Sequence, residues 1–414
     1  MKKILFFILS IFMLFSISAQ NIIVLHAGDS KLGDTSAFQI ATDELRKFYP
    51  NVKIIWSKLD LTDGSTLTMD AMLAAGTPPN LYLDSTVRAG KYLLPEYALP
   101  LNGLVNGLDK FAPGVLDPFT KNGKVLGIPY AGSSQGMCIN LDVMKEIGFT
   151  VKPDWTIADF LKMAELVKQK YGGKKWATGM FAANQSGDYL LNNWYASFGV
   201  KWYENGDYDK ALVYKNGGAK VYEFYQTLVK NGYVPPNSAN LNDDDYAAMW
   251  AEGKLVATAF FPPWCDMYFD TAIKQKLIDK PFNYAFVPFP RAPGVTKVGT
   301  YNNSTVAIVH KTGTNIDTVV AKLVEILSSA SMQDKLATIG VFPNRVDAKP
   351  VKDQYIAQVV KIVNENGIHD FGLTDRRFTE RRAQQYPILQ QVLNLKISPE
   401  EASKKFEAAL NSVK

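Results

Sequence analysis

The sequence contains few of the residues that bind metals or build disulfide frameworks. Among 414 residues there are three histidines, at positions 26, 310 and 369, and two cysteines, Cys138 and Cys265. These residues are too far apart along the chain to form the spacing of a zinc site. A single cysteine pair in so long a chain is no disulfide framework, so we expect two buried free thiols, with one Cys138–Cys265 bridge as the alternative. The sequence predicts no metal and no cofactor.

Charge of one sign is scarce as well. The formal net charge is +5 at pH 7, and it is +3 once Lys2 and Lys3 are set aside. Because nucleic-acid-binding proteins carry a larger or more clustered basic surplus, this composition predicts no nucleic-acid partner. Hydrophobic residues make up 47% of the chain and charged residues 21%, which is near the average of folded proteins. At about 100 to 200 residues per domain, the length predicts two lobes.

Long hydrophobic runs are missing except at the N-terminus. There Lys2 and Lys3 precede an apolar run at 4–17, which is followed by Ser18, Ala19 and Gln20. This order of charged, apolar and small residues is typical of a secretory signal peptide, so we expect 1–19 to be a leader that is cleaved after Ala19. The run is shorter than the ~20 residues that span a bilayer, and no cysteine follows it. The sequence therefore predicts an exported, periplasmic protein without a membrane span or a lipid anchor.

Catalytic motifs are absent too. The chain has no Gly-x-Ser-x-Gly, no His-Glu-x-x-His and no Gly-rich phosphate loop. A secreted glycoside hydrolase would need a pair of carboxylates, and no spacing among the 40 acidic residues singles one pair out. The sequence thus favours a binding protein over an enzyme, with the hydrolase kept as an alternative.

The first part of the chain alternates between strand and helix patterns. The strands are predicted at 21–26, 52–56 and 81–83, and the helices at 38–49 and 66–75. This alternation predicts a doubly wound α/β sheet, in which ligands bind beyond the carboxyl ends of the strands. Asp29 and Asp84 follow the first and third strands, and Arg88 comes shortly after.

A hinge is predicted at 123–140. Asn122-Gly123 is a hairpin signal, and Pro129 then interrupts the strand pattern because it has no N–H to donate. A small polar link at 131–135 leads into the apolar run 137–139. We expect the chain to leave one lobe and enter the other here, with Ser133 and Gln135 at the crossing.

The second half shows several clear boundaries. Thr156 and Asp159 form a capping-box pattern before an amphipathic helix, and Ser398 and Pro399 open the last helix. Strands are expected at 176–181, 255–261 and 283–290, and a helix at 188–198 with Trp194 in the core. Pro262 and Pro263 end the second of these strands, which predicts that Trp264 is presented on a loop.

Several segments in this order resemble the extracellular solute-binding proteins of family 1, the maltose-binding-protein-like receptors of ABC importers. They are LAAGTPPN at 73–80, GIPY at 127–130 running into INLD at 139–142, YENGDYD at 203–209, AMWAEGK at 248–254 and PPW at 262–264. The resemblance covers essentially the whole chain after the leader. One departure is Asn80, where the family commonly has an aspartate.

The resemblance implies an α/β, two-lobed periplasmic-binding-protein fold, with a doubly wound sheet flanked by helices in each lobe. We expect the N-terminal lobe to comprise 20–130 and 290–327, and the C-terminal lobe 131–289 and 328–414. Two or three hinge crossings join lobes of this kind, and the ligand is trapped when they close. The implied partners are a small-molecule ligand and the permease subunits of an ABC transporter, and the receptor is expected to be a monomer.

A sugar site needs aromatic faces for the ring and planar polar groups for the hydroxyls. Trp264 is the leading candidate because a large tryptophan is seldom left on a loop without a role. The candidate ligand-binding residues lie at strand ends, at crossings or toward the crevice: Asp29, Asp84, Arg88, Ser133, Gln135, Asp188, Tyr189, Trp264, Tyr301, Asn302 and Arg345.

Two further predictions concern charged groups, one in the ligand and one in the protein. A charged solute, such as a polyamine, a phosphate ester or a metal chelate, is the alternative ligand on the same fold, whereas twenty tyrosines and seven tryptophans favour a sugar. The four arginines at 376, 377, 381 and 382 are expected on a solvated helix face rather than at an anion site.

Overall fold

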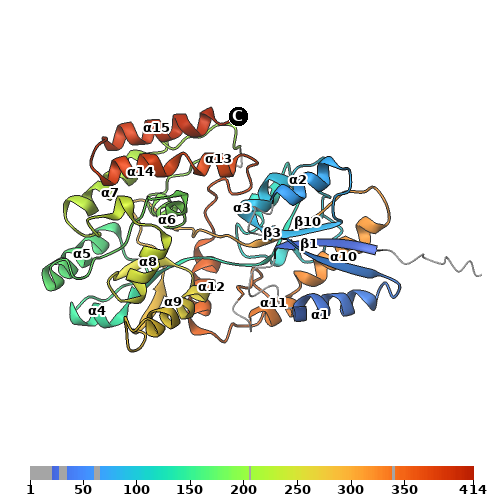
Figure 1. Ribbon diagram of the computed structural model, residues 1–414, viewed down its shortest axis with the longest axis horizontal. Coiled ribbons are helices and arrows are strands. Elements are labelled where there is room, and N and C mark those ends of the chain that lie inside the picture. Colours follow the sequence, from blue (N-terminus) through green and yellow to red (C-terminus); the bar gives the residue numbers. More distant parts are fainter. Residues whose placement is uncertain (1–20, 28–34, 60–65, 205–206, 338–340) are drawn as a thin grey trace, which may run out of the picture.

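The computed structural model has two lobes that lie side by side along its longest axis (Figure 1). The structure describes residues 21–27, 35–59, 66–204, 207–337 and 341–414. The predicted leader and Asp29 lie outside these described residues.

The N-terminal lobe is built on a five-stranded sheet with the order β2-β1-β3-β10-β6. Its strands are β1 (Asn21–Ala27), β2 (Lys53–Leu59), β3 (Leu81–Ser85), β6 (Ile128–Ala131) and β10 (Thr305–Val309). β1 runs parallel to β2 and β3, as the alternating pattern predicts, whereas β10 pairs antiparallel with β3 and β6. A strand from late in the chain therefore joins two segments from its beginning.

Helices cover both faces of this sheet (Figure 1). α2 (Thr66–Ala74) and α3 (Thr86–Ala89) lie on one side, and α1 (Thr35–Arg46), α10 (Ile316–Leu327) and α11 (Ala330–Ala337) lie on the other. Val24 and Leu25 are consecutive in β1, and they belong to the two apolar clusters on opposite faces. The ribbon of β4 (Thr120–Lys121) and β5 (Lys124–Val125) turns at Asn122 and Gly123, whose φ angles of 49° and 73° confirm the predicted hairpin turn.

The C-terminal lobe contains a three-stranded sheet with the order β8-β7-β9. β7 (Gly136–Asn140) pairs antiparallel with both β8 (Ala257–Phe260) and β9 (Tyr284–Val287). The two-lobed α/β architecture is thus confirmed, but this sheet is small and antiparallel where a doubly wound sheet was expected. Residues 176–181 do not add a strand, because Trp176 makes only an isolated bridge to Leu255.

Most of the helices belong to the C-terminal lobe. They are α4 (Leu141–Glu146), α5 (Ile157–Tyr171), α6 (Asp188–Ser197), α7 (Gly218–Lys230), α8 (Asp243–Ala251), α9 (Pro262–Lys274), α12 (Gln354–Asn366), α13 (Phe378–Arg382), α14 (Gln385–Leu393) and α15 (Pro399–Ser412). The capping box of Thr156 and Asp159 is confirmed at the start of α5, and Ser398 caps α15 ahead of Pro399. Trp194 is buried on α6, as predicted.

The prediction for Pro262 and Pro263 is wrong in one respect. They do follow β8, but they form the first turn of α9, and Trp264 lies on this helix rather than on a loop. Proline fits the first turn because its missing N–H would have no partner there in any case.

Two crossings between the lobes are paired through their backbones. Gln135 donates its N–H to the carbonyl oxygen of Tyr301 at 3.2 Å, and Asn303 donates to Ser133 at 2.8 Å. Gly132 is paired in the same way with Phe342, and a Cβ at position 132 would lie 2.8 Å from the Phe342 carbonyl oxygen. The hinge segment predicted at 131–135 is therefore an ordered part of a paired structure, and only glycine fits at 132.

The packing suggests lobe boundaries that differ from those expected. The backbone N–H of Ala292 donates to the carbonyl oxygen of Ser197, so the chain is still in the C-terminal lobe at 292. We therefore propose that the second crossing lies at 300–304 rather than at 290. α11 packs on α1, α10 and β6, whereas α12 packs on β9 and α9. We therefore propose that the third crossing follows α11, at 346–353, instead of starting at 328.

Two of the four arginines expected on a solvated face are buried. Arg382 donates to both carboxylate oxygens of Asp188, at 2.8 and 2.7 Å, and both side chains are at most 6% exposed. Arg381 pairs with the buried Asp375 and donates to the carbonyl oxygen of Tyr208. The expectation is wrong for this pair because the side chains of α13 hold the C-terminal helices on the rest of the lobe.

Asp188→Asn should destabilise the C-terminal lobe strongly. The change leaves the Arg382 guanidinium buried without a countercharge, and removing one partner of a buried pair costs about 3 to 5 kcal/mol. Urea unfolding of the isolated protein measures the loss. Glu380→Gln is the matched control, because Glu380 is exposed on the same helix and should change the free energy of unfolding by less than about 0.5 kcal/mol. Equal effects of the two substitutions would contradict the structural role of the pair.

Candidate functional site

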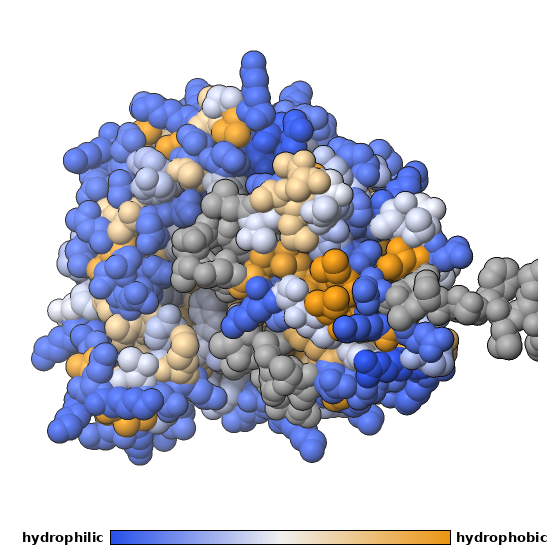
Figure 2. Space-filling model, turned by 45° about the vertical axis from the view of Figure 1, so that its right-hand side comes forward, coloured by the Kyte–Doolittle hydropathy of each residue, from blue (hydrophilic) through white to orange (hydrophobic). Residues whose placement is uncertain are grey.

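An aromatic pocket lies on the C-terminal lobe next to the first crossing. Its volume is about 170 Å³, and its walls come from α6, α8, β8, α9 and the crossing. The lining residues are mostly aromatic or apolar: Gln135, Phe181, Leu190, Asp243, Tyr246, Ala247, Ala259, Phe260, Phe261, Trp264, Met267 and Tyr268. Ligand sites commonly measure about 300 to 1,000 Å³, so this pocket alone is smaller than a typical site. Figure 2 shows a recess in the surface between the two lobes.

Trp264 provides an exposed ring at this pocket. It is 42% exposed although it is a large apolar side chain, and its ring centroid lies 4.5 Å from that of Phe261. Phe260 supports it from the side at 6.4 Å in a perpendicular arrangement. Tyr268 follows one turn later on the same face of α9. Two rings on one helix face, backed by buried phenylalanines, suit stacking against a flat, partly apolar ligand.

Gln135 brings an amide to the same pocket. Its side chain is completely buried, and Oε1 accepts a hydrogen bond from Nδ2 of Asn193 at 2.5 Å. Among the described residues, none accepts a hydrogen bond from Nε2 of Gln135. The pocket therefore combines ring faces with one buried amide donor.

Asp84 and Arg88 form a pair at the end of β3 in the N-terminal lobe. Arg88 donates to Asp84 through Nε at 2.9 Å and Nη2 at 2.5 Å, and the hydroxyl of Tyr82 donates to the same carboxylate at 2.7 Å. Burial, together with the Asp84 charge, raises the pKa of Tyr82, so its hydroxyl keeps its proton. Asp84 is fully buried, whereas the Arg88 side chain is 37% exposed. Asp84 thus holds Arg88, and Arg88 is the more exposed member of the pair.

The pair is tied to the second crossing through Thr86. Its backbone N–H and its hydroxyl both donate to the carbonyl oxygen of Ser304, at 2.9 and 2.7 Å. Asn302 in turn donates to Oγ of Ser134 at 2.7 Å and accepts from the backbone N–H of Ser304 at 3.0 Å. Hydrogen bonds therefore connect the N-terminal lobe, the second crossing and the first crossing in that order.

Ser133 and Asn302 lie at the crossings, as expected, but their hydrogen bonds join the two crossing strands. Ser133 is only half-buried, whereas Asn302 is buried. Neither residue is among those that line the aromatic pocket. Contact of these two side chains with a ligand stays a prediction.

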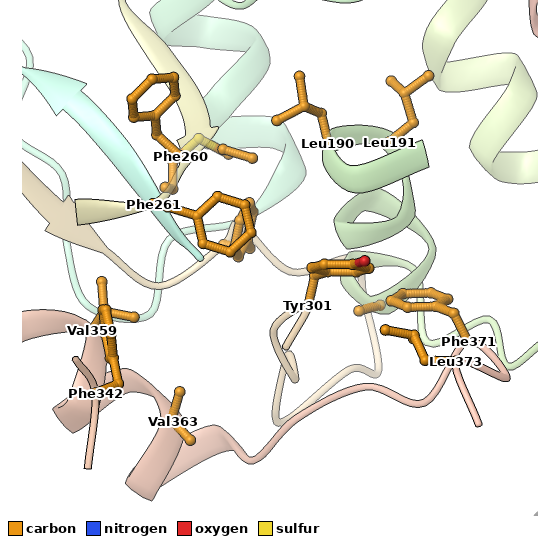
Figure 3. Close-up of a cluster of buried hydrophobic side chains, with 14 of the residues drawn as sticks. Leu190, Leu191, Phe260, Phe261, Tyr301, Phe342, Val359, Val363, Phe371 and Leu373 are labelled. Atoms are coloured by element: carbon orange, nitrogen blue, oxygen red, sulfur yellow. The ribbon is translucent and has the colours of Figure 1, made fainter. Parts of the chain in front are cut away.

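Three other candidate residues make contacts with other side chains of the protein. Tyr301 is completely buried, with its ring between Phe261 and Phe371, as Figure 3 shows. Asp188 is occupied by Arg382. Arg345 pairs with Asp347 at 2.8 Å and donates to the carbonyl oxygen of Gly107. We do not carry these three into the proposed site. Tyr189 belongs to α6, next to the pocket residue Leu190, and its side chain lies outside the described residues.

Sequence reasoning missed most of the pocket wall. Phe260 and Phe261 belong to the strand predicted at 255–261, and neither they nor Tyr246 and Tyr268 are among the predicted ligand-binding residues, yet all four line the pocket. A signal was present, because proline at the first helical position would place Trp264 and Tyr268 four residues apart on one helix face.

The described residues contain no group of three histidine, cysteine or acidic side chains that could hold a metal ion. Cys138 and Cys265 are both buried and free, which confirms the expected thiols rather than a bridge. Burial raises the pKa of the Cys265 thiol, so it is unreactive as a nucleophile. In the same part of the chain, no helix is both long and apolar enough to cross a bilayer.

Three solved structures are similar to the chain over almost its full length. A family 1 extracellular solute-binding protein from Bifidobacterium longum subsp. infantis has a TM-score of 0.74 at 16% identity, covering 95% of this chain and 99% of that one. The cyclic alpha-maltosyl-1,6-maltose binding protein from Arthrobacter globiformis has a TM-score of 0.76 at 17% identity, with 95% and 98% covered. The sugar-binding protein MalE from Xanthomonas citri has a TM-score of 0.78 at 14% identity, with 95% and 97% covered. At these identities the likeness establishes the fold alone.

Comparison by sequence gives the family. No curated protein matches the chain. The family model described as "Bacterial extracellular solute-binding protein" matches residues 40–359, which is well over half of the chain. This match agrees with the resemblance carried by the sequence motifs and with the two-lobed fold. The chain belongs to the bacterial extracellular solute-binding proteins.

Proposed function

We propose that this protein is the substrate-binding protein of an ABC importer. In this proposal it captures a sugar or an oligosaccharide between its lobes and delivers it to a membrane permease. It acts as an exported, periplasmic monomer from which the leader has been removed near Ala19. The observation that carries the proposal is the pocket beside the first crossing, where the exposed ring of Trp264 lies close to the buried amide of Gln135.

The two lobes offer different chemistry to a ligand. The C-terminal lobe presents ring faces, which pack against the C–H surface of a sugar. The N-terminal lobe presents Arg88, a planar donor whose orientation is held by Asp84. Hinge closure around the paired crossings would bring these groups together and exclude water. The sugar would leave chemically unchanged, because such a site needs neither a nucleophile nor a general acid.

A receptor for an anionic solute, such as a phosphate ester, is the second candidate. It is favoured by the partly exposed side chain of Arg88, since arginine is well suited to bind phosphate and carboxylate groups. The ring-lined pocket favours the sugar, because a small anion gains little from stacking.

The purified protein should bind a saccharide and leave it intact. A thermal-shift screen against maltose, maltotriose, cellobiose, chitobiose, putrescine and glycerol phosphate identifies the class of ligand, because a ligand at 100 times its Kd adds about 2.7 kcal/mol of stability. Mass spectrometry after long incubation should show only the starting sugar. A cleaved product would establish the hydrolase instead.

Salt separates the two candidate ligand classes. For a neutral sugar, the Kd measured by calorimetry should change by less than about twofold between low salt and about 0.5 M, since the Debye length falls below ~5 Å without affecting stacking. A steep loss of affinity over this range would favour the anionic solute.

Trp264→Ala should weaken sugar binding by about thirtyfold to several hundredfold. Loss of a stacking tryptophan costs about 2 to 4 kcal/mol of binding free energy. The melting temperature should change little, because the ring is 42% exposed. Phe48→Ala is the control, since Phe48 is 58% exposed on the N-terminal lobe and outside the pocket. An unchanged affinity together with a sharply lower melting temperature would identify Trp264 as a core residue.

A further inference from the structure

Two buried amides form a relay between the second crossing and the aromatic pocket. Asn193 on α6 accepts the backbone N–H of Tyr301 through Oδ1 at 2.9 Å. Its Nδ2 donates to Oε1 of Gln135 at 2.5 Å. The backbone N–H of Gln135 donates to the carbonyl oxygen of Tyr301 at 3.2 Å. This bond closes a ring of three hydrogen bonds. Both amide side chains are completely buried.

The backbone of Tyr301 fixes the direction of every bond in this relay. A peptide N–H can only donate, so Asn193 must turn its oxygen toward Tyr301. Its nitrogen then faces Gln135, which must answer with Oε1 because two NH₂ groups cannot bond each other. Because Oε1 faces Asn193, Nε2 is the end of the Gln135 amide that takes no part in the relay. It has no acceptor among the described residues, and Gln135 is part of the pocket lining.

A buried donor without an acceptor is unfavourable in the empty protein and favourable once a ligand supplies an oxygen. We propose that Nε2 of Gln135 donates to an oxygen of the bound sugar, and that Asn193 is the positioning residue that fixes this polarity. The inference rests on the proposed function, because it names the contact that the same pocket makes with its ligand.

The fixed polarity has a consequence for specificity. Ring oxygens, glycosidic oxygens and acetamido carbonyls can only accept, and hydroxyls can accept, so all of these fit opposite Nε2. A protonated amine can only donate, and it would leave two donors facing each other. The pocket therefore selects a sugar with an oxygen at this point against the analogue with an amino group there.

The test measures affinity in three variants. The probe is whichever of maltose, maltotriose, cellobiose and chitobiose binds the wild-type protein most tightly. Gln135→Ala removes the donor, and we expect about a tenfold loss of affinity. Asn193→Asp replaces the Nδ2 donor by an oxygen, so Gln135 turns Nε2 toward the new carboxylate and presents Oε1 to the ligand. We expect about a threefold to tenfold loss, although Asn193 does not line the pocket.

The double variant tests whether Asn193 acts through Gln135. If it does, Gln135→Ala with Asn193→Asp should bind within about twofold of Gln135→Ala alone, because the residue to be oriented is gone. Losses that simply multiply would overturn the inference. Should Asn193→Asp fail to fold, Gln135→Glu provides the same readout, since its carboxylate accepts from Asn193 and offers no donor to the ligand.

Asn192→Asp is the matched control for burying a carboxylate on this helix. Asn192 is the neighbouring residue on α6, equally buried, and its Oδ1 accepts from Gln385 at 3.0 Å, outside the pocket. It introduces a buried carboxylate at the neighbouring position and should leave the affinity within about twofold. If the control lost as much affinity as Asn193→Asp, the proposed role of Asn193 would be wrong, whereas the proposal of a sugar receptor would still stand. Failure of the wild-type protein to bind any of the four sugars would instead overturn the proposed function and this inference with it.

Discussion

Backbone hydrogen bonds between the first and second crossings hold the two lobes in register. Gln135 donates to Tyr301 and Asn303 donates to Ser133, so two strands from distant parts of the chain run side by side where the lobes meet. Both lobes contribute to the proposed site through residues connected to this pairing. Gln135 lies on one crossing, Arg88 is connected to the other through Thr86 and Ser304, and the aromatic pocket begins where the first crossing enters β7. A motion that bends these strands would carry both walls of the site with it.

Neutral amides and hydroxyls make several of the hydrogen bonds at this junction. Asn302 bonds Ser134 and Ser304. Asn344 donates through Nδ2 to the carbonyl oxygen of Pro129 at 2.8 Å and through its backbone N–H to Oε1 of Gln333. Burying an amide costs less than burying a charge, and each amide has one donor end and one acceptor end. The junction is therefore ordered without an ion pair between the crossing strands, while the charged pairs Asp84–Arg88 and Asp188–Arg382 are kept within single lobes.

The fold could be predicted from the sequence because local signals agreed with one another. The alternation of strands and helices gave the parallel core of the N-terminal sheet, and the Asn122-Gly123 turn and the Thr156 capping box were found at their residues. The antiparallel C-terminal sheet was not predicted, because short apolar runs such as 257–260 carry no information on pairing. Part of the pocket lining is among the predicted site residues. Trp264 and Gln135 line the pocket, whereas Asp188 is held by the distant Arg382, and Arg345 by the nearby Asp347 and the distant carbonyl oxygen of Gly107. A charged residue at the right place in the chain looks the same whether it faces a ligand or a buried arginine.

The position of β10 between β3 and β6 has a consequence for the folding of this chain. Thr305 pairs with Ser85 across more than 200 residues of intervening sequence, and the whole C-terminal sheet lies within that interval. The N-terminal sheet cannot be completed until β10 has been synthesised, and closing so large a loop is slow compared with local helix formation. A chain with this order of strands is therefore expected to complete its N-terminal sheet later after synthesis than a chain whose sheet is assembled from neighbouring segments.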